Sequence, residues 1–278
     1  MMMKKLILAI FSVLVISIPS SIAYATIGGQ ATGSVQIINP TSELFCGKTL
    51  VEWKNFGANI INGTDGRDVI HGTKKVDVII AKDGDDIVLA RDGNDCIIGG
   101  SGNDRIVGDK GDDVVFGNEG NDIVHGGKGN DFVDGGSGND RIDGNHDNDT
   151  IMGGDGNDRI WGGLGNDSID AGSGSDTVST NQGNDTIMGG DGNDWLSAGI
   201  GDDIIRAGSG EDKLFGGPGN DDLFGENDND KIHGSQGNDD LNGGNDTDIC
   251  HDKQGNNRFI SCEKRIPFNE EDEPEDDE

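Results

Sequence analysis

Aliphatic and acidic side chains recur with a period of nine residues over most of the chain. An Asp stands at every ninth position from Asp68 to Asp248, in 21 consecutive copies without insertion or deletion. Ile, Val or Leu follows two residues later in 20 of these copies, and Cys250 takes that place in the last. Gly stands two residues before the Asp in 17 copies. The triplet around each aliphatic residue predicts a short strand with one inward side chain, and the Gly-rich segment predicts a turn.

One repeat is too small to fold alone, because it contributes a single inward aliphatic side chain. Two repeats, with two strands and two turns, would form a coil of 18 residues. Stacking such coils at the strand spacing of ~4.8 Å would pair each strand with the strand one coil away. The aliphatic side chains would then be buried in a double row. The pattern therefore predicts an all-β solenoid.

Composition by itself favours a different state. The chain has 49 Gly among 278 residues and a formal net charge of −32, as expected for an acidic, disordered polymer. The strict order of the repeats, which composition ignores, favours a folded solenoid instead. The negative charge argues against nucleic-acid binding, which needs a basic face. The abundance of helix-weakening Gly argues against an ordinary α/β enzyme.

The repeats resemble those of a known family. Full copies of the motif G-G-x-G-x-D-x-U-x, where U is a large aliphatic residue, include Gly99–Val107, Gly126–Asp134 and Gly153–Trp161. This motif resembles the nonapeptide of the RTX (repeats-in-toxin) family. The resemblance covers about 200 of the 278 residues. It implies a right-handed parallel β-roll, a β-solenoid of 18-residue coils capped at both ends.

Stacked coils would place the repeat Asp residues in two columns, one with eleven members and one with ten. Carboxylates ~5 Å apart would repel by on the order of 3 kcal/mol at an effective dielectric constant of about 20. A hard divalent cation would remove this repulsion, and oxygen-only ligands select Ca²⁺ over Zn²⁺ or Cu²⁺. Since the ligand geometry scarcely exists in the unfolded chain, we expect the coil to fold on Ca²⁺ binding and to melt in chelator.

The RTX resemblance also implies which residues bind calcium. In that family each Ca²⁺ lies between adjacent turns, held by repeat Asp carboxylates and backbone carbonyls of the Gly-rich turn. Two columns of eleven and ten loops leave at most 19 such gaps. The candidate carboxylates are Asp86, Asp95, Asp104, Asp113, Asp122, Asp131, Asp140, Asp158, Asp167, Asp176, Asp185, Asp194, Asp203, Asp212, Asp221 and Asp239. The candidate turn glycines are Gly100, Gly102, Gly127, Gly129, Gly136, Gly138, Gly154, Gly156, Gly163, Gly165, Gly190, Gly192, Gly217 and Gly219.

Some turns depart from the motif. Weak sites are expected near Asp77, Asp149 and Asp230, because their turns replace Gly with other residues or add positive charge.

The four cysteines indicate disulfides in an exported protein. Three pairings are possible. Cys250 and Cys262 are twelve residues apart around the end of the repeats, so we pair them, which leaves Cys46 with Cys96. These bonds would keep the two ends of the stack from fraying.

The remaining segments lie at the ends of the chain. Residues 1–25 have a basic start, an apolar stretch of 13 residues and a final Ala-Tyr-Ala, as in a secretory signal peptide. An uncleaved membrane anchor is the alternative, but the stretch is short of the ~20 residues that span a bilayer. Residues 26–56 are predicted as an N-terminal cap, 57–266 as the roll with its C-terminal cap, and 267–278 as an acidic disordered tail.

Several side chains are expected on the outer faces. Four histidines would line one sheet, where His233 and His251 could hold a transition metal or serve as polar decoration. Four aromatic side chains would also point outward, either as a patch for a partner or as cross-strand packing. The histidines are His71, His125, His233 and His251, and the aromatic residues are Phe116, Trp161, Phe215 and Phe224.

These features together predict a secreted, extracellular or cell-surface protein that binds multiple calcium ions and has a structural role. No catalytic motif such as H-E-x-x-H or G-x-S-x-G occurs, so no enzymatic activity is expected. An adhesion or ligand-binding module that uses the outward strand faces is an alternative, as is a secreted RTX hydrolase or its non-enzymatic remnant. The sequence does not identify a cell-surface or matrix partner.

Overall fold

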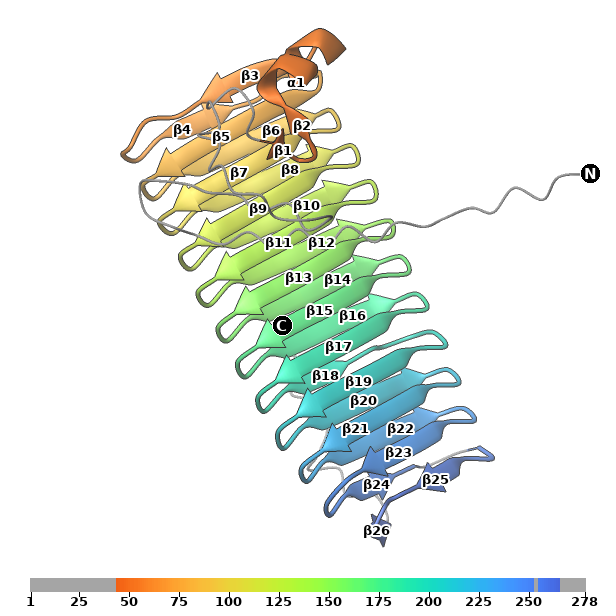
Figure 1. Cartoon of the computed structure of the whole chain (residues 1–278). Coiled ribbons are helices and arrows are strands. Elements are labelled where there is room, and N and C mark those ends of the chain that lie inside the picture. The colour runs from red at the N-terminus through yellow and green to blue at the C-terminus, as the bar shows by residue number, and fades with distance from the viewer. Residues whose placement is uncertain (1–43, 253–254, 266–278) are drawn as a thin grey trace, which may run out of the picture.

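The computed structural model describes residues 44–252 and 255–265. The predicted signal peptide and acidic tail lie outside these residues, as does the part of the predicted N-terminal cap before residue 44. The described chain forms an elongated stack of coils with one short helix at its N-terminal end (Figure 1).

Two parallel sheets of twelve strands each form the two sides of the stack. The even sheet contains β4 (Val69–His71), β6 (Ile87–Asp92), β8 (Arg105–Lys110), β10 (Ile123–Lys128), β12 (Arg141–His146), β14 (Arg159–Leu164), β16 (Thr177–Gln182), β18 (Trp195–Ser197), β20 (Lys213–Pro218), β22 (Lys231–Gln236), β24 (Ile249–His251) and β26 (Lys264–Arg265). The odd sheet contains β3 (Asn59–Asn62), β5 (Asp77–Asp83), β7 (Cys96–Ser101), β9 (Val114–Glu119), β11 (Phe132–Ser137), β13 (Thr150–Asp155), β15 (Ser168–Ser173), β17 (Thr186–Asp191), β19 (Ile204–Ser209), β21 (Asp222–Asn227), β23 (Asp240–Gly244) and β25 (Arg258–Ile260).

Each interior strand pairs with the strands one coil before and one coil after it. Val124 in β10, for example, is in parallel register with Ile106 in β8 and with Ile142 in β12, 18 residues away on either side. The predicted all-β solenoid of 18-residue coils is therefore confirmed.

Most interior strands are longer than the predicted triplet. Strand β11 has six residues, and its parallel pairing continues through Gly136 to Ser137. Gly136 has a φ of 103°, a conformation open to glycine, so the chain bends there without leaving the ladder. The turn itself is thus limited to the few residues before the next repeat Asp.

The core is the predicted double row of aliphatic side chains. Val124 and Ile142 of the even sheet face Val133 and Ile151 of the odd sheet, and all four are fully buried. Each repeat contributes one such side chain, so the core continues along the stack and no coil has a core of its own.

The N-terminal end is closed by a hairpin and a helix. Strands β1 (Leu44–Phe45) and β2 (Lys48–Thr49) are antiparallel, and α1 (Leu50–Phe56) follows directly. Thr49 caps the helix, since its hydroxyl accepts the N–H of Glu52 and the Glu52 carboxylate accepts the N–H of Thr49. Trp53 packs against Val78 and Cys96 of the first odd strands. The sequence analysis did not predict this helix.

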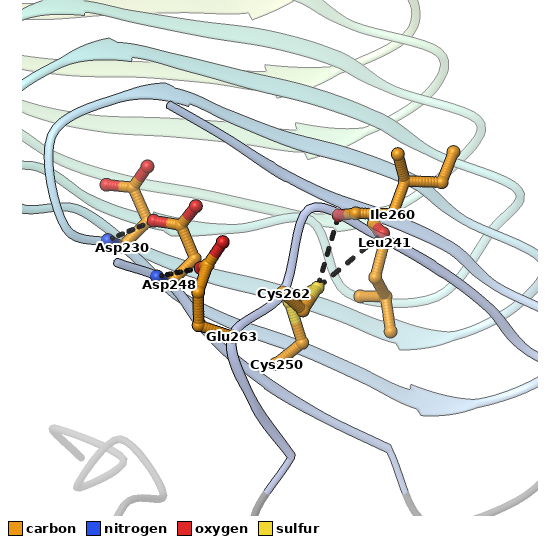
Figure 2. The surroundings of a disulfide bond; sticks show 7 residues. All are labelled: Asp230, Leu241, Asp248, Cys250, Ile260, Cys262 and Glu263. Atoms are coloured by element: carbon orange, nitrogen blue, oxygen red, sulfur yellow. Dashed lines mark hydrogen bonds between the residues drawn. A yellow bond between two sulfur atoms is a disulfide. The ribbon is translucent and has the colours of Figure 1, made fainter. Parts of the chain in front are cut away.

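Both predicted disulfides are present. Cys46 in the hairpin is bonded to Cys96 in β7, and Cys250 in β24 is bonded to Cys262 just before β26 (Figure 2). Each bond ties an end of the described chain to a coil of the stack. No helix among the described residues is long and apolar enough to cross a membrane.

Candidate metal centre

The structure gathers the sixteen Asp residues predicted as ligands into two columns. One column follows the starts of the even strands and the other follows the starts of the odd strands. All sixteen side chains are between 0% and 2% exposed, although aspartate is usually a surface residue. Because burial removes these carboxylates from water, each oxygen needs a partner within the folded protein or a bound ion.

One oxygen of each carboxylate holds the coils in register. The backbone N–H of Asp140 donates to Oδ1 of Asp158 at 2.8 Å, and the N–H of Asp158 donates to Oδ1 of Asp176 at 2.7 Å. The same bond recurs between members 18 residues apart along both columns, for example from Asp131 to Asp149. Every coil is therefore hydrogen-bonded to the carboxylates of the coil that follows it.

The other carboxylate oxygen has no protein partner. In 19 repeat Asp residues, from Asp86 to Asp248, Oδ2 is buried and accepts no hydrogen bond within the described part of the chain. An unpaired buried carboxylate oxygen carries a large desolvation cost. Cations bound to these oxygens would explain why the oxygens are buried without hydrogen-bond donors.

Two oxygen atoms and one aliphatic carbon line the space beside Oδ2. A Cβ added to Gly135 would lie 2.5 Å from Oδ2 of Asp140, 2.6 Å from the carbonyl oxygen of Gly153 in the next coil and 3.0 Å from Cδ1 of Ile142. At the position of Gly135, five residues before the Asp, every repeat has Gly or Ala except for Thr180. A carboxylate and a backbone carbonyl thus face one small space, and such oxygen donors fit Ca²⁺.

Burial strongly changes the protonation of these carboxylates. Burial raises the pKa of Asp113 to about 8, the N–H of Asp95 that it accepts opposes this, and the carboxylates of Asp131 and Asp95 raise it further. Burial likewise raises the pKa of Asp104 to about 6. Repulsion along the column therefore acts in the predicted direction, but loss of solvent is the larger cause.

The fourteen candidate glycines all adopt positive φ angles. Gly154 and Gly156, for example, have φ angles of 111° and 131°. A Cβ on Gly156 would collide with the carbonyl oxygen of Gly138 in the preceding coil. These glycines let the turns stack closely enough for the carbonyls of successive coils to approach the carboxylates.

The turns that depart from the motif keep the same backbone shape in two of three cases. Asn145 and Asp147 before Asp149 have φ angles of 78° and 75°, which Asn and Asp tolerate. Oδ2 of Asp149 is also buried and without a partner, as in Asp230. The weak sites expected there stay a prediction.

Asp77 differs from the other members of its column. Its Oδ2 accepts the backbone N–H of Thr73 at 2.6 Å and the Thr73 hydroxyl at 3.1 Å. This carboxylate is therefore satisfied within its own loop, which is consistent with a weak site at this position.

A second, exposed polar ladder was not predicted from the sequence. Asn precedes 13 of the 21 repeat Asp residues. In many of these copies its side-chain oxygen accepts the backbone N–H of the corresponding residue in the next coil. Asn139 donates in this way to Asn121 at 2.6 Å, and Asn157 donates to Asn139 at 2.7 Å. The recurrent Asn-Asp pairs at nine-residue spacing are the signal that could have revealed it.

The C-terminal ends of the columns are closed by other residues. The N–H of Asp239 donates to Oδ1 of Asn257 at 2.9 Å, and the N–H of Asp248 donates to the Glu263 carboxylate at 2.8 Å (Figure 2). Glu263 lies next to the disulfide partner Cys262 in sequence. The bond that anchors the last coil thus also positions the group that ends one column.

The histidines and aromatic residues lie on the outer faces of the sheets, as the repeat predicts. The four histidines are on strands of the even sheet, and the rings of His233 and His251 are 6.4 Å apart. Among the described residues, no group of three or more His, Cys, Asp or Glu side chains converges on a metal position. The aromatic side chains pack on neighbours, for example Phe215 on Trp195 at 5.0 Å.

Among the described residues, the Asp columns likewise do not bring three or more side-chain ligands to one position. A cation between coils would need backbone carbonyls in addition to carboxylates, as the space beside Asp140 provides. A parallel β-roll with buried carboxylate columns at its turns defines a calcium-binding repeat solenoid.

Comparison with known proteins identifies the family. The model of the RTX calcium-binding nonapeptide repeat (4 copies) matches residues 55–74, 71–106, 98–133, 107–142, 116–149, 143–178, 179–214 and 215–250. These segments together extend from residue 55 to residue 250, well over half of the chain. The chain belongs to the RTX calcium-binding nonapeptide-repeat family. No curated protein sequence matches it.

Proposed function

We propose that the chain is a secreted structural module that folds and becomes rigid when Ca²⁺ binds between its turns. The observation that carries this proposal is the set of 19 buried Oδ2 atoms without a hydrogen-bond partner. Ca²⁺ bound there would supply the positive charge and oxygen coordination that these carboxylates need. Family membership supports calcium as the ion.

The repeat Asp carboxylates link the proposed calcium sites of adjacent turns to one another. Oδ1 of Asp158 accepts the N–H of Asp140, so the carboxylate that presents Oδ2 also holds the preceding coil. Ordering one turn therefore orders its neighbour, and folding should spread along the stack. The sixteen predicted carboxylates and the carbonyls of the turn glycines are the proposed ligands, with at most 19 sites.

The first test is a calcium titration of the full chain. Ca²⁺ should produce the far-UV circular dichroism of β-structure in a cooperative transition, and excess EGTA should abolish it. Mg²⁺ is the control, since it prefers a rigid octahedral shell that retains several waters and should not replace Ca²⁺. Calorimetry gives the stoichiometry. A spectrum that is unchanged by EGTA contradicts the proposal.

Secretion is supported by the two disulfides and by the export-type sequence of residues 1–25. RTX-like sites in an extracellular module can also work at weak affinity, because such modules bind Ca²⁺ in the range of about 10⁻⁴–10⁻³ M. Mass spectrometry of protein recovered from the culture medium should give an N-terminus at Thr26. Protein that stays inside the cell and keeps residues 1–25 contradicts secretion.

The proposed role is non-catalytic. Among the described residues, the buried acidic side chains all belong to the two columns, where they fit calcium binding. The competing proposal is a hydrolase. Assays of the calcium-loaded protein with peptide, ester and glycoside substrates should show no turnover, and turnover that is lost in EGTA would favour the hydrolase.

A further inference from the structure

The outward faces of the two sheets carry opposite charge. We consider the residues one and three positions after each repeat Asp, which point away from the core. On the even sheet these positions hold five cations and one acid: Arg105, Arg141, Arg159, Lys213, Lys231 and Asp143. On the odd sheet they hold four acids and one cation: Asp134, Asp170, Asp222, Asp240 and Arg206. Arg258 of β25, which follows Asn257, adds a second cation at the C-terminal end of this sheet.

The last residue of the strands with six or seven residues continues this separation. It is acidic in Asp83, Glu119, Asp155 and Asp191 of the odd sheet. In the even sheet this position adds Lys110 and Lys128, with Asp92 as its one acid among the described strands. A chain with a net charge of −32 thus keeps a cationic face on one side of the roll.

Lys110 on the even face is neutralised by Asp92 at 2.9 Å, but most other cations of this face are not neutralised locally. Arg105, Arg159, Lys213 and Lys231 form no ion pair within the described part of the chain. The Nζ of Lys213 lies 4.6 Å from the ring centroid of Trp195, and the Arg141 guanidinium lies 4.6 Å from that of Trp161. Cations on aromatic rings give this face a flat contact surface.

The odd face offers matching acceptors. Asp134 and Asp170 are half-buried, and each stands in register beside Met152 of β13. Neither carboxylate forms an ion pair among the described residues. Met152, Met188 and Ile204 are exposed on the same face, so it also has apolar surface to cover.

The two faces have the same repeat distance because the same coils form both. Lys213 and Lys231 are in direct register on adjacent even strands, as Asp222 and Asp240 are on adjacent odd strands. Asp240 is already paired with Arg258 at 3.1 Å, so a docking cation would share this carboxylate. A row of cations on one copy can therefore meet a row of acids on another copy at the same spacing. Contacts between unlike faces do not close on themselves, so they propagate from copy to copy.

We propose that the even face of one copy docks on the odd face of a second copy, so that calcium-loaded rolls associate side by side. The proposal rests on the proposed function, because both faces exist only in the folded roll. Bound Ca²⁺ would also offset the net negative charge that otherwise drives copies apart. Each strand presents few side chains to the contact, so the association should be weak, below a standard interface of ~800 Å² per partner.

The test is sedimentation of the full chain in saturating Ca²⁺ over a range of protein concentrations. The average mass should rise with concentration at low ionic strength and fall back towards the monomer at high salt. The variant Lys213→Glu/Lys231→Glu has an acidic even face, and Asp222→Lys/Asp240→Lys has a more basic odd face. Each alone should associate roughly tenfold more weakly or worse. An equal mixture of the two should recover association.

The control is Arg67→Glu/Lys75→Glu, which makes the same charge change as Lys213→Glu/Lys231→Glu but in exposed turns outside the faces. It should associate like the original chain. Circular dichroism of every sample separates the two proposals. A folded, calcium-loaded chain that stays monomeric overturns the docking alone, as does a mixture that fails to recover or a control as weak as the face variants. A chain that calcium does not fold overturns both proposals.

Discussion

At the scale of the single residue, the two carboxylate oxygens have distinct roles in 19 of the 21 repeat Asp residues, from Asp86 to Asp248. Oδ1 accepts a backbone N–H of the preceding coil, while Oδ2 is buried without a hydrogen-bond partner. The sequence predicts which Asp residues form the columns, because the period of nine is unbroken. It does not predict the division between the two oxygens, since the donor for Oδ1 is a backbone group 18 residues away that stacking alone brings close.

This division predicts effects of different size for Asp158→Asn in the two states of the protein. At saturating Ca²⁺ the variant should be less stable and need more Ca²⁺ to fold, because a ligand charge is lost. Without Ca²⁺ it should destabilise the roll less, because the buried charge is gone. Denaturant unfolding with and without Ca²⁺ measures both.

The matched control is Asp155→Asn in the same repeat, three residues earlier and exposed. It removes the same charge outside the column, so it should shift the calcium midpoint little. Equal shifts in the two variants would mean that general charge, and not ligand position, determines binding.

Gly156 tests the left-handed backbone of the turns. Gly156→Val should lower the unfolding free energy by about 1–3 kcal/mol or more, because a β-branched residue resists positive φ and its Cβ meets Gly138. Gly156→Asn should cost less, since Asp147 occupies the equivalent position with a φ of 75°. Thermal unfolding in saturating Ca²⁺ compares them, and equal losses would contradict the backbone argument.

At the scale of the element, the sequence predicts strand centres better than strand ends. The triplet Phe132–Asp134 is predicted correctly, but β11 extends to Ser137 because the glycines stay in the ladder. Helix α1 was missed because it lies outside the periodic region and has only seven residues. Its local signals were the capping box formed by Thr49 and Glu52 and the C-terminal cap at Gly57.

The two disulfides stabilise different lengths of chain. Cys46–Cys96 encloses a separation of 50 residues and Cys250–Cys262 one of twelve. A disulfide stabilises the fold by restricting the unfolded chain. Changing both cysteines to Ser should therefore lower the free energy of unfolding by about 4 kcal/mol for Cys46–Cys96 and about 3 kcal/mol for Cys250–Cys262. Denaturant unfolding in saturating Ca²⁺ checks this order.

Hydrogen exchange separates local from global effects of the same substitutions. Cys250→Ser/Cys262→Ser should expose β24 and the backbone N–H of Asp248, because the chain that carries Glu263 is no longer anchored. Amides of interior strands such as β14 should keep their protection. Equal loss of protection along the whole stack would contradict a local role for this end.

At the scale of the whole molecule, the columns make the calcium-free protein sensitive to pH. Burial raises the pKa of Asp113 and Asp221 to about 8 and that of Asp104 to about 6, against ~3.9 in an unfolded chain. The folded state therefore binds more protons than the unfolded state between these values. Its stability is greatest near the unfolded pKa and falls as pH rises through the folded pKa values.

Protein freed of calcium with a chelating resin should therefore gain β-structure when the pH is lowered from about 8 to about 5. Far-UV circular dichroism measures the gain, and light scattering shows that it is not aggregation. With limiting Ca²⁺ the trend should reverse, because ligand carboxylates must be deprotonated to bind a metal. An unchanged calcium-free spectrum between the two pH values would show that the buried carboxylates do not oppose folding.

The equivalence of successive coils also determines how the length of this protein can change. A gain or loss of 18 residues, for example between equivalent points of β12 and β14, adds or removes one coil and changes the stack by ~4.8 Å. Both caps and both outer faces are preserved. A change of nine residues would instead move every later strand to the opposite sheet and exchange the two faces beyond that point. The stack can therefore change its length in steps of one coil, while the caps at its two ends stay the same.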